Sequence, residues 1–498
     1  MESTRSEVVK LDAVPDFGAI DADADGLLRD CFQDHPAYDR AKDNISFLIL
    51  GRKGSGKTAI YRRIITERSA DVFSFGHSFD DYPWPHHDLQ AQTGVPEERR
   101  YIHSWKYLIL MSLSKVLLNR DQGQPWGEDA FDSLGALEEF VVDSYGSRDP
   151  DVRQLFSPEK ELRFKTGFKL PFVEISGERL RVRELPTQAQ EVNRAMQHHV
   201  LRVLNPYSFY YICFDQLDLG FTATQPEYGQ RLIGLLLAAR DLFISARDQG
   251  KKLNVVVFLR DDIYQDLQFE DKNKITENYT TRVEWTDSEE EGLTLKQLME
   301  SRFNAVLGDT NRAIAWTDVF DESKEMPSRQ SKYKHICDRT FLRPRDMIKF
   351  CNEILAVYKI KTRTGELAAF DNSCIHSARD AYSDYLLNEL DDEIAKHVPK
   401  YKDYLEILKS IGSEKFSFQA FAERWEERGR IDALDPVEAL AKLFEFSVVG
   451  YLKTGGRGGG SEYAWKYRDY RARFDSTAET FRVHPGFKEA FDLTRSSG

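Results

Sequence analysis

The sequence predicts an α/β fold built on a parallel β-sheet, followed by helical segments. Three almost wholly apolar runs of strand length cover residues 45–50, 209–214 and 254–259. Such runs are typical of strands that are covered on both faces, as in a parallel sheet. A long helical pattern at residues 229–247 separates the last two runs. This alternation of strand and helix indicates a parallel sheet with helices on both sides.

The length of 498 residues is too great for one ordinary hydrophobic core, so we expect several domains. The composition, 41% hydrophobic and 30% charged, is that of a folded protein. Apolar periodicity and turn signals change along the chain, and the changes suggest the boundaries. We expect an acidic N-terminal segment (1–25), an α/β core (26–290) with a helical and hairpin insertion (about 121–186), a helical lid (291–400) and a winged-helix-like domain (401–498).

Charge and composition limit the classes of partner. The formal net charge of −13 gives no overall attraction to nucleic acid or to an anionic membrane surface. No apolar run approaches the roughly 20 residues that cross a bilayer, and residues 1–11 lack the apolar region of a signal peptide. We therefore expect a cytoplasmic protein without a membrane partner. The five cysteines are scattered and form no CxxC pair, which argues against a disulfide framework or a zinc site.

Residues 51–58 read GRKGSGKT and satisfy the pattern G-x-x-x-x-G-K-[ST] in full, directly after an apolar strand. Glycines let the backbone curve around a phosphate, and the following helix adds its positive N-terminal end. We expect Lys57 to reach the β- and γ-phosphates and the Thr58 hydroxyl to coordinate Mg²⁺. No N-K-x-D motif is present, which favours ATP over GTP. The residues expected to contact the nucleotide are Gly51, Arg52, Lys53, Gly54, Ser55, Gly56, Lys57, Thr58 and Ala59.

A carboxylate for the metal is expected at the end of a neighbouring strand. The run FYYICF at residues 209–214 ends in Asp215, which we assign as the metal-associated (Walker B) residue. Many ATPases carry a second acid at the next position, where this chain has Gln216. Either Asp218 orients the attacking water instead, or hydrolysis is slow. The alternative is that Asp218 caps the following turn.

A third strand supplies a candidate phosphate sensor. Residues 254–259 run into Arg260, and an arginine at the tip of a strand beside the nucleotide site can contact the γ-phosphate through two N–H groups. The alternative is a surface salt bridge from Arg260 to Asp261 or Asp262. The predicted catalytic set is Lys57, Asp215, Asp218 and Arg260.

These motifs together resemble the STAND and KAP-like branch of the ASCE P-loop ATPases, which are related to the AAA+ and origin-recognition ATPases. The resemblance rests on the P-loop, on FDQLD (214–218), VVVFLRDDIY (255–264) and RPRD (343–346), and on the winged-helix-like end. A bacterial group of P-loop ATPases with FLR-x-DI and DKNK motifs is more similar still, with DKNK here at 271–274. The resemblance spans about residues 25–490.

The resemblance implies a switch driven by ATP and Mg²⁺, with the nucleotide between core and lid. It also implies that Arg345 is the lid's sensor arginine; the alternative is pairing with Asp346. Arg282 is a candidate for an arginine supplied to a neighbouring subunit, because related ATPases form homo-oligomers. Relatives in this branch are often encoded in bacterial antiphage systems, where they license a partner effector. By analogy we expect a protein effector partner here.

Three other functions remain open. A DNA-associated ATPase of the origin-recognition or transposition-regulator type would use the basic and aromatic run KYRDYRAR (466–473), but the acidic helix before it favours protein over DNA. A nucleotide-gated scaffold that does not hydrolyse ATP fits Gln216. A small-molecule kinase fits the long lid and the C-terminal domain poorly. His86 and His87 suggest a metal at first sight, but without supporting ligands we expect them in a solvated loop.

Overall fold

The computed structural model describes residues 10–79, 82, 87, 96–121, 128–156, 162–163, 169–170, 173–174, 179–180, 185–218, 226–308, 312–363, 367–429, 434–453 and 461–494. The chain forms two compact units, each with its own hydrophobic core. The sheet unit consists of Asp34–Arg52 and Lys57–Val283. The helical unit consists of Met1–Gln33, Lys53–Gly56 and Glu284–Gly498. None of the described helices is long and apolar enough to span a bilayer.

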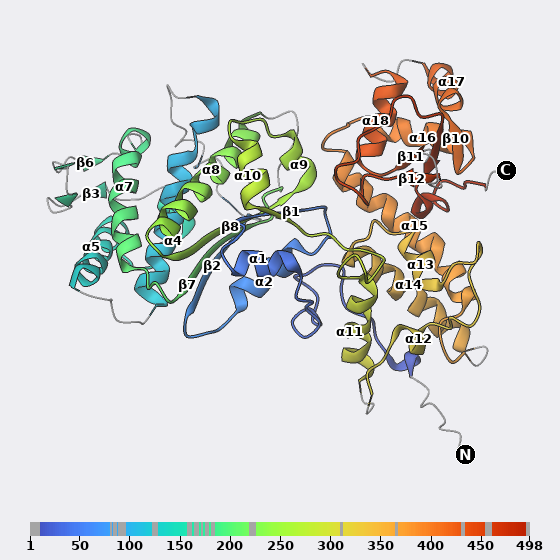
Figure 1. Ribbon diagram of the computed structural model, residues 1–498, viewed down its shortest axis with the longest axis horizontal. Helices are drawn as coiled ribbons and strands as arrows, with labels where there is room; N and C mark the ends of the chain where they lie inside the picture. Colours follow the sequence, from blue (N-terminus) through green and yellow to red (C-terminus); the bar gives the residue numbers. More distant parts are fainter. Residues whose placement is uncertain are drawn as a thin grey trace. The chain divides into compact units, whose positions relative to one another are not determined.

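The sheet unit is organised around five parallel strands in the order β2-β7-β8-β1-β9 (Figure 1). Strand β8 thus lies between the strand that precedes the P-loop and the strand that ends in Asp215. This is the strand order of the ASCE class of P-loop NTPases, so the predicted fold class is confirmed. The strands are β1 (Leu48–Gly51), β2 (Val72–Ser78), β7 (Phe209–Asp215), β8 (Lys252–Arg260) and β9 (Thr280–Arg282).

Helices cover the sheet because its central strands are buried along nearly their whole length. Helix α2 packs against β1, β2, β7 and β8, whereas α8 packs on β8 and on α4. The crossovers through α2 and α8 run in opposite directions along the sheet, so right-handed connections place these helices on opposite faces. The helices are α1 (Pro36–Lys42), α2 (Lys57–Thr66), η2 (Glu97–Arg99), α4 (Ile102–Asn119), α7 (Leu185–Val203), α8 (Pro226–Asp248), α9 (Asp261–Asp266) and α10 (Lys272–Tyr279).

The insertion between β2 and β7 is helical with short hairpins. Within it, helices α5 (Glu128–Tyr145) and α6 (Val152–Phe156) precede the hairpin strands, and α5 packs against α7. Strand β3 (Leu162–Arg163) pairs antiparallel with β6 (Arg179–Leu180), and β4 (Lys169–Leu170) pairs with β5 (Val173–Glu174). The hairpin predicted near these residues is therefore present as two short antiparallel pairs.

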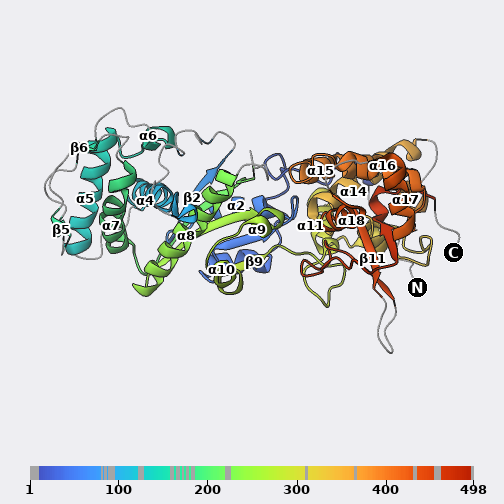
Figure 2. The same cartoon turned by 90° about the horizontal axis from the view of Figure 1, so that it is seen from above.

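Most of the helical unit, Glu284–Gly498, follows the sheet strands in the sequence. Helices α14 (Pro344–Thr362) and α15 (Asn372–Ile394) pack against each other (Figure 2). The rings of Phe350 and Tyr382 stack between them, with their centroids 4.2 Å apart. The 3₁₀-helix η1 near the N-terminus contacts α14. The elements are η1 (Leu11–Ala13), α11 (Leu295–Leu307), α12 (Trp316–Val319), α13 (Lys332–Cys337), α14 (Pro344–Thr362) and α15 (Asn372–Ile394).

The described residues between 401 and 494 form, in order, a helix, a strand, two helices and an antiparallel hairpin, and their assignment as a winged-helix-like domain stays a prediction. One further strand, β13, was not predicted and joins the sheet in the order β10-β13-β11-β12. The predicted domain boundaries stay a prediction. The elements are α16 (Tyr401–Ile411), β10 (Lys415–Ser417), α17 (Phe418–Arg428), α18 (Pro436–Glu445), β11 (Val449–Lys453), β12 (Glu462–Ala464), β13 (Thr480–Val483) and η4 (Pro485–Phe487).

Candidate nucleotide site

The glycine-rich loop joins the end of β1 at Gly51 to the start of α2 at Lys57. Gly54 and Gly56 have φ angles of +78° and +106°. A side chain is strained in this region, whereas glycine adopts it freely. Gly54 and Gly56 thus permit the turn that brings backbone N–H groups together ahead of the helix N-terminus.

Lys57 lies over its own loop. Its Nζ donates hydrogen bonds to the carbonyls of Gly51 and Arg52, both at 3.0 Å. Burial lowers the pKa of Lys57, and Arg260 acts in the same direction, while Asp218 and Asp215 oppose the shift. The ammonium group is therefore the centre of a charged cluster formed by the predicted catalytic residues.

Asp215 ends β7 and is only 3% exposed. Burial raises its pKa to about 6, although a hydrogen bond with Thr58 and the charge of Lys57 both lower it. Its Oδ2 is buried without a hydrogen-bond partner among the described residues. A hydroxyl beside an unsatisfied carboxylate oxygen is a donor set suited to a hard divalent cation. Thr58 and Asp215 thus fit the predicted Mg²⁺.

The positions after Asp215 are held in an unusual conformation. Gln216 has a φ of +59°, which is uncommon for a residue with a side chain, and its Oε1 accepts a hydrogen bond from Ser78 Oγ at 2.7 Å. Asp218 accepts a hydrogen bond from Arg260 Nη1 at 3.3 Å. Asp218 therefore faces the charged cluster, whereas the amide of Gln216 takes the place where many ATPases carry an acid.

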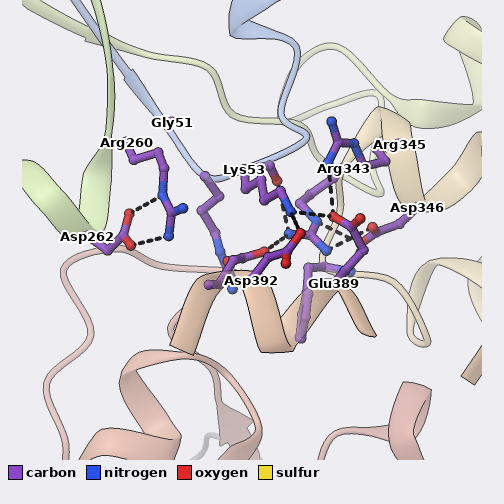
Figure 3. Close-up of polar contacts among 12 residues, drawn as sticks. Gly51, Lys53, Arg260, Asp262, Arg343, Arg345, Asp346, Glu389 and Asp392 are labelled. Carbon is purple, nitrogen blue, oxygen red and sulfur yellow. Dashed lines mark hydrogen bonds and ion pairs between the residues drawn. The ribbon is translucent and has the colours of Figure 1, made fainter. Parts of the chain in front are cut away.

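Arg260 ends β8 in register with Gly51 and is only 3% exposed. Asp262 holds it through two bonds, from Nε at 3.0 Å and from Nη2 at 2.5 Å (Figure 3). The neighbouring Asp261 instead accepts a hydrogen bond from Arg282 Nε at 3.2 Å. The salt bridge considered as an alternative for Arg260 therefore exists with Asp262, but its guanidinium is buried and lies beside the P-loop strand, while Asp262 is 26% exposed.

The loop tip, residues 53–56, makes its contacts within the helical unit. The carbonyls of residues 53, 54 and 55 each accept a hydrogen bond there. The donors are Arg343 Nη1 at 2.9 Å, the Arg345 amide at a long 3.5 Å and Trp285 Nε1 at 2.9 Å. Sequence reasoning missed Arg343 and Trp285 as contacts of the loop, because an acceptor on the main chain leaves no trace in the sequence.

Carboxylates of α15 add ion pairs to the same tip. Lys53 Nζ lies 2.6 Å from Asp392 and 3.4 Å from Glu389, and Figure 3 shows both carboxylates turned toward it. Glu389 also accepts from Arg345 Nη1 at 2.9 Å. Arg345 Nε donates to the Ile20 carbonyl at 3.2 Å. The side chain of Lys53 is thus committed to α15, while its peptide remains part of the loop.

Asp346 pairs with Arg343 rather than with Arg345. Nε and Nη2 of Arg343 both reach Asp346 at 2.9 Å, and Nη1 reaches Glu393 at 2.5 Å. The pairing with Asp346 considered as the alternative for Arg345 is therefore absent among the described contacts. A sensor role for Arg345 stays a prediction.

Other motifs have structural tasks. Asp271 of DKNK precedes α10 with a φ of +67° and pairs with Lys274 at 2.7 Å. Lys272 Nζ donates to two carbonyls at the C-terminal end of α9, those of Gln265 and Leu267. The expectation for His87 was wrong: it is fully buried and bonds Ser104 Oγ at 2.7 Å. The described residues contain no group of three or more potential metal-ligating side chains.

Within KYRDYRAR, two cations are engaged inside the helical unit. Lys466 Nζ donates to the carbonyls of Tyr470 and Ala472 at 2.6 and 3.0 Å. Arg468 pairs with Asp287 and Asp338 at 3.1 and 3.0 Å. These two side chains therefore stabilise the fold around the hairpin.

Comparison with known proteins gives one family match. Residues 293–391 match a family described as the FunZ-associated C-terminal helical domain. The match spans α11 through most of α15. No curated protein matches the chain.

Several solved structures are similar across most of their length. The Orc1 protein of Aeropyrum pernix, in complex with DNA, has 13% identity and a TM-score of 0.33, covering 88% of this chain and 89% of that one. A Walker-type ATPase of Pyrococcus abyssi has 12% identity and a TM-score of 0.37, covering 87% and 93%. The Cdc6 protein of Pyrobaculum aerophilum has 10% identity and a TM-score of 0.28, covering 89% and 86%. We base the function on the residues of the site.

Proposed function

We propose that this chain binds ATP with Mg²⁺ and hydrolyses it slowly as a regulatory switch. The observation that carries the proposal is the buried Oδ2 of Asp215, which lacks a hydrogen-bond partner among the described residues. Thr58 and Lys57 lie close to the same carboxyl group. A carboxylate oxygen that is buried without a hydrogen-bond partner is costly. A cation bound to the phosphates of a nucleotide would give this oxygen a partner.

Each residue of the site has a task in this proposal. The loop N–H groups hold the phosphates, and Lys57 exchanges the Gly51 and Arg52 carbonyls for phosphate oxygens. When bound, Mg²⁺ neutralises charge that develops on the phosphates. Arg260, oriented by Asp262, stabilises the same charge, and Asp218 orients water.

The loop tip supports the switch. Its N–H groups face the nucleotide in a P-loop, whereas the carbonyls of residues 53–55 bond to Arg343, Arg345 and Trp285 of the helical unit. A phosphate that reorients these peptides changes both sets of hydrogen bonds at once. Nucleotide state and the conformation of the helical unit are then linked thermodynamically.

The output of the switch follows from the resemblance to STAND and KAP-like ATPases. We propose that the ATP-bound chain assembles as a homo-oligomer and licenses a protein effector in a bacterial antiphage system. Arg282, on the β9 edge strand, is the proposed contribution to a neighbouring site. A DNA-associated role would instead appear as stimulation of turnover by duplex DNA that collapses as salt rises.

Steady-state ATP turnover tests the proposal. Lys57→Ala and Asp215→Asn should each lower turnover by about 100-fold or more, because each removes charge stabilisation at the phosphates. Asp39→Asn, an exposed position on α1, is the matched control and should leave turnover unchanged. Equal turnover in all four proteins, with or without duplex DNA, would refute the assignment of the site.

Gln216 favours a second candidate, a scaffold that binds ATP without hydrolysing it. The hydrogen bond from Ser78 fixes an amide, which cannot accept a proton, at the position after Asp215. Incubation of the chain with ATP and Mg²⁺, followed by chromatography of the bound nucleotide, separates the two functions. Intact ATP after many hours would favour the scaffold, and ADP would favour the switch.

A further inference from the structure

A polar cavity lies in the helical unit, far along the chain from the P-loop motif. Its volume is about 620 Å³, within the range of small-molecule sites, and its lining residues all fall between residues 328 and 488. We call it the cationic pocket. Six cationic side chains line it: Lys334, Arg339, Lys415, Arg468, Arg482 and Lys488.

The charge of the pocket is opposite to that of the chain. The chain carries a formal net charge of −13, whereas the pocket lining carries six cations and three carboxylates, Asp338, Glu414 and Glu462. Two carboxylates outside the lining also pair with these cations: Asp287 with Lys334 and Arg468, and Glu489 with Arg339. Concentrated positive charge with low-dielectric walls focuses the field and raises the local concentration of anions. The pocket is therefore suited to an anionic ligand.

The excess of positive charge is greatest around Glu414, which is 7% exposed. Arg482 donates to Glu414 Oε1 from Nε at 2.7 Å and from Nη2 at 2.5 Å, and Lys488 lies 3.6 Å from Oε2. Burial alone raises the pKa of Glu414, but Arg482, Lys488 and Arg339 together lower it. Arg339 has its own ion pair with Glu489 at 2.7 Å, so the positive charge left for a ligand here is that of Arg482 and Lys488, which share Glu414.

Aromatic rings accompany these cations. Lys415 and Arg482 both lie over the ring of Tyr463, at 6.0 and 5.5 Å from its centroid. Trp465 is 6.3 Å from Tyr463 between ring centroids, and Tyr467 is 6.0 Å further along the same row. Flat rings beside cations bind ligands that combine an aromatic ring with a phosphate. Lys415 is exposed and forms no ion pair with the described residues.

We propose that the cationic pocket binds a small nucleotide. Its phosphate lies against Lys415, Arg482 and Lys488, and its base packs against the aromatic row. The carboxylates of the lining accept hydrogen bonds from ribose hydroxyls or from amino groups of the base. The site is separate from the P-loop and would let a second nucleotide act on the chain as an effector.

Calorimetric titration of the full chain with AMP, GMP, CMP and UMP tests the proposal. These probes lack the β- and γ-phosphates that Lys57 is proposed to contact. Separate titrations with adenosine and with inorganic phosphate show how much of the affinity comes from the base and how much from the phosphate. At least one monophosphate should bind one-to-one, with a Kd below about 1 mM, and the Lys57→Ala chain should bind it equally well.

Three variants locate the binding. Lys415→Gln removes an exposed cation without an ion pair, and Tyr463→Leu removes the ring, so each should weaken binding by about tenfold. Lys402→Gln is the matched control, 77% exposed on α16, and should bind normally. Both pocket variants should retain the melting temperature of the parent chain.

Two results would overturn the proposal. One is the absence of binding by all four monophosphates below about 1 mM. The other is binding that Lys57→Ala abolishes while Lys415→Gln and Tyr463→Leu preserve it. In the first case, binding of duplex DNA that Lys415→Gln weakens would assign the pocket to nucleic acid. These binding results do not depend on ATP turnover, so they can be interpreted even if the P-loop does not hydrolyse ATP.

Discussion

Replacing Arg343 with alanine should damage the helical unit more than any comparable substitution on its surface. Arg343 is 1% exposed and bonds Asp346 twice, Glu393 once and the Lys53 carbonyl once. Asp346 and Glu393 are also buried, at 0% and 5% exposure. The alanine variant therefore leaves two buried carboxylates and one main-chain acceptor without their cation.

The size of the effect follows from burial. Breaking a buried ion pair by removing one partner costs about 3–5 kcal/mol, because a desolvated charge remains. Arg312 offers a matched control, since it makes a comparable two-bond pair with Asp318, at 3.2 and 2.7 Å, but is 53% exposed. Arg312→Ala should cost no more than about 1 kcal/mol.

Differential scanning calorimetry of the full chain measures the difference. For a unit of this size each kcal/mol shifts the Tm by roughly 2–4 °C, so Arg343→Ala should lower the Tm of the affected transition by about 6–20 °C. Arg312→Ala should lower it by less than about 4 °C. A shift for Arg343→Ala no larger than that for Arg312→Ala would refute the reasoning from buried charge.

Three further predictions concern the nucleotide site. Asp215 has a pKa raised to about 6 by burial, so its metal-binding carboxylate form is lost as pH falls through 6. Affinity for MgATP should fall over that window in the parent chain more steeply than in Asp215→Asn, and parallel slopes in fluorescence titrations would contradict the assignment. The same shift means that apo stability declines as pH rises from about 4 to 6, since the folded chain binds the proton more tightly than the unfolded one. Trp285→Phe removes the hydrogen bond to the Ser55 carbonyl and should weaken ATP binding by about tenfold, whereas Trp425→Phe in α17 should not; equal titrations would show that the bond is dispensable. Gln216→Glu places an acid beside Asp215 and should raise single-turnover hydrolysis at least about tenfold, and an unchanged rate would show that the amide at this position does not limit hydrolysis.

The sequence predicted the centre of the sheet better than its edge. Strands β7 and β8 are buried on both faces, and this burial requires the continuous apolar runs that mark them. Strand β9 has three residues, all half-buried, and strand β13 carries a mixed pattern, TFRV. Short edge strands pair through main-chain groups, which any side chain permits. Their positions depend on partners, such as β1 for β9, that are distant in the sequence.

The site divides in the same way. Lys57, Thr58 and Asp215 were predictable because strand, loop and carboxylate appear in a fixed local order. Trp285 and Arg343 were not, since they lie 230 and 290 residues from the carbonyls they bond. The pairing of Arg260 with Asp262 was considered from the sequence, whereas the burial of Arg260 could be seen only in the folded structure.

The division of the P-loop between two units has a consequence for synthesis. The sheet strands up to Asp215 emerge from the ribosome well before Arg343, whose guanidinium follows Lys53 by 290 residues. At a translation rate of roughly 5–20 residues per second, Arg343 is synthesised about 15–60 s after the loop tip whose carbonyl it bonds. A nascent chain therefore carries a complete nucleotide motif before the hydrogen bonds behind it exist. Competence to signal would be acquired last, once α14 and α15 have folded, so that a stalled or truncated chain holds the motif without its means of response.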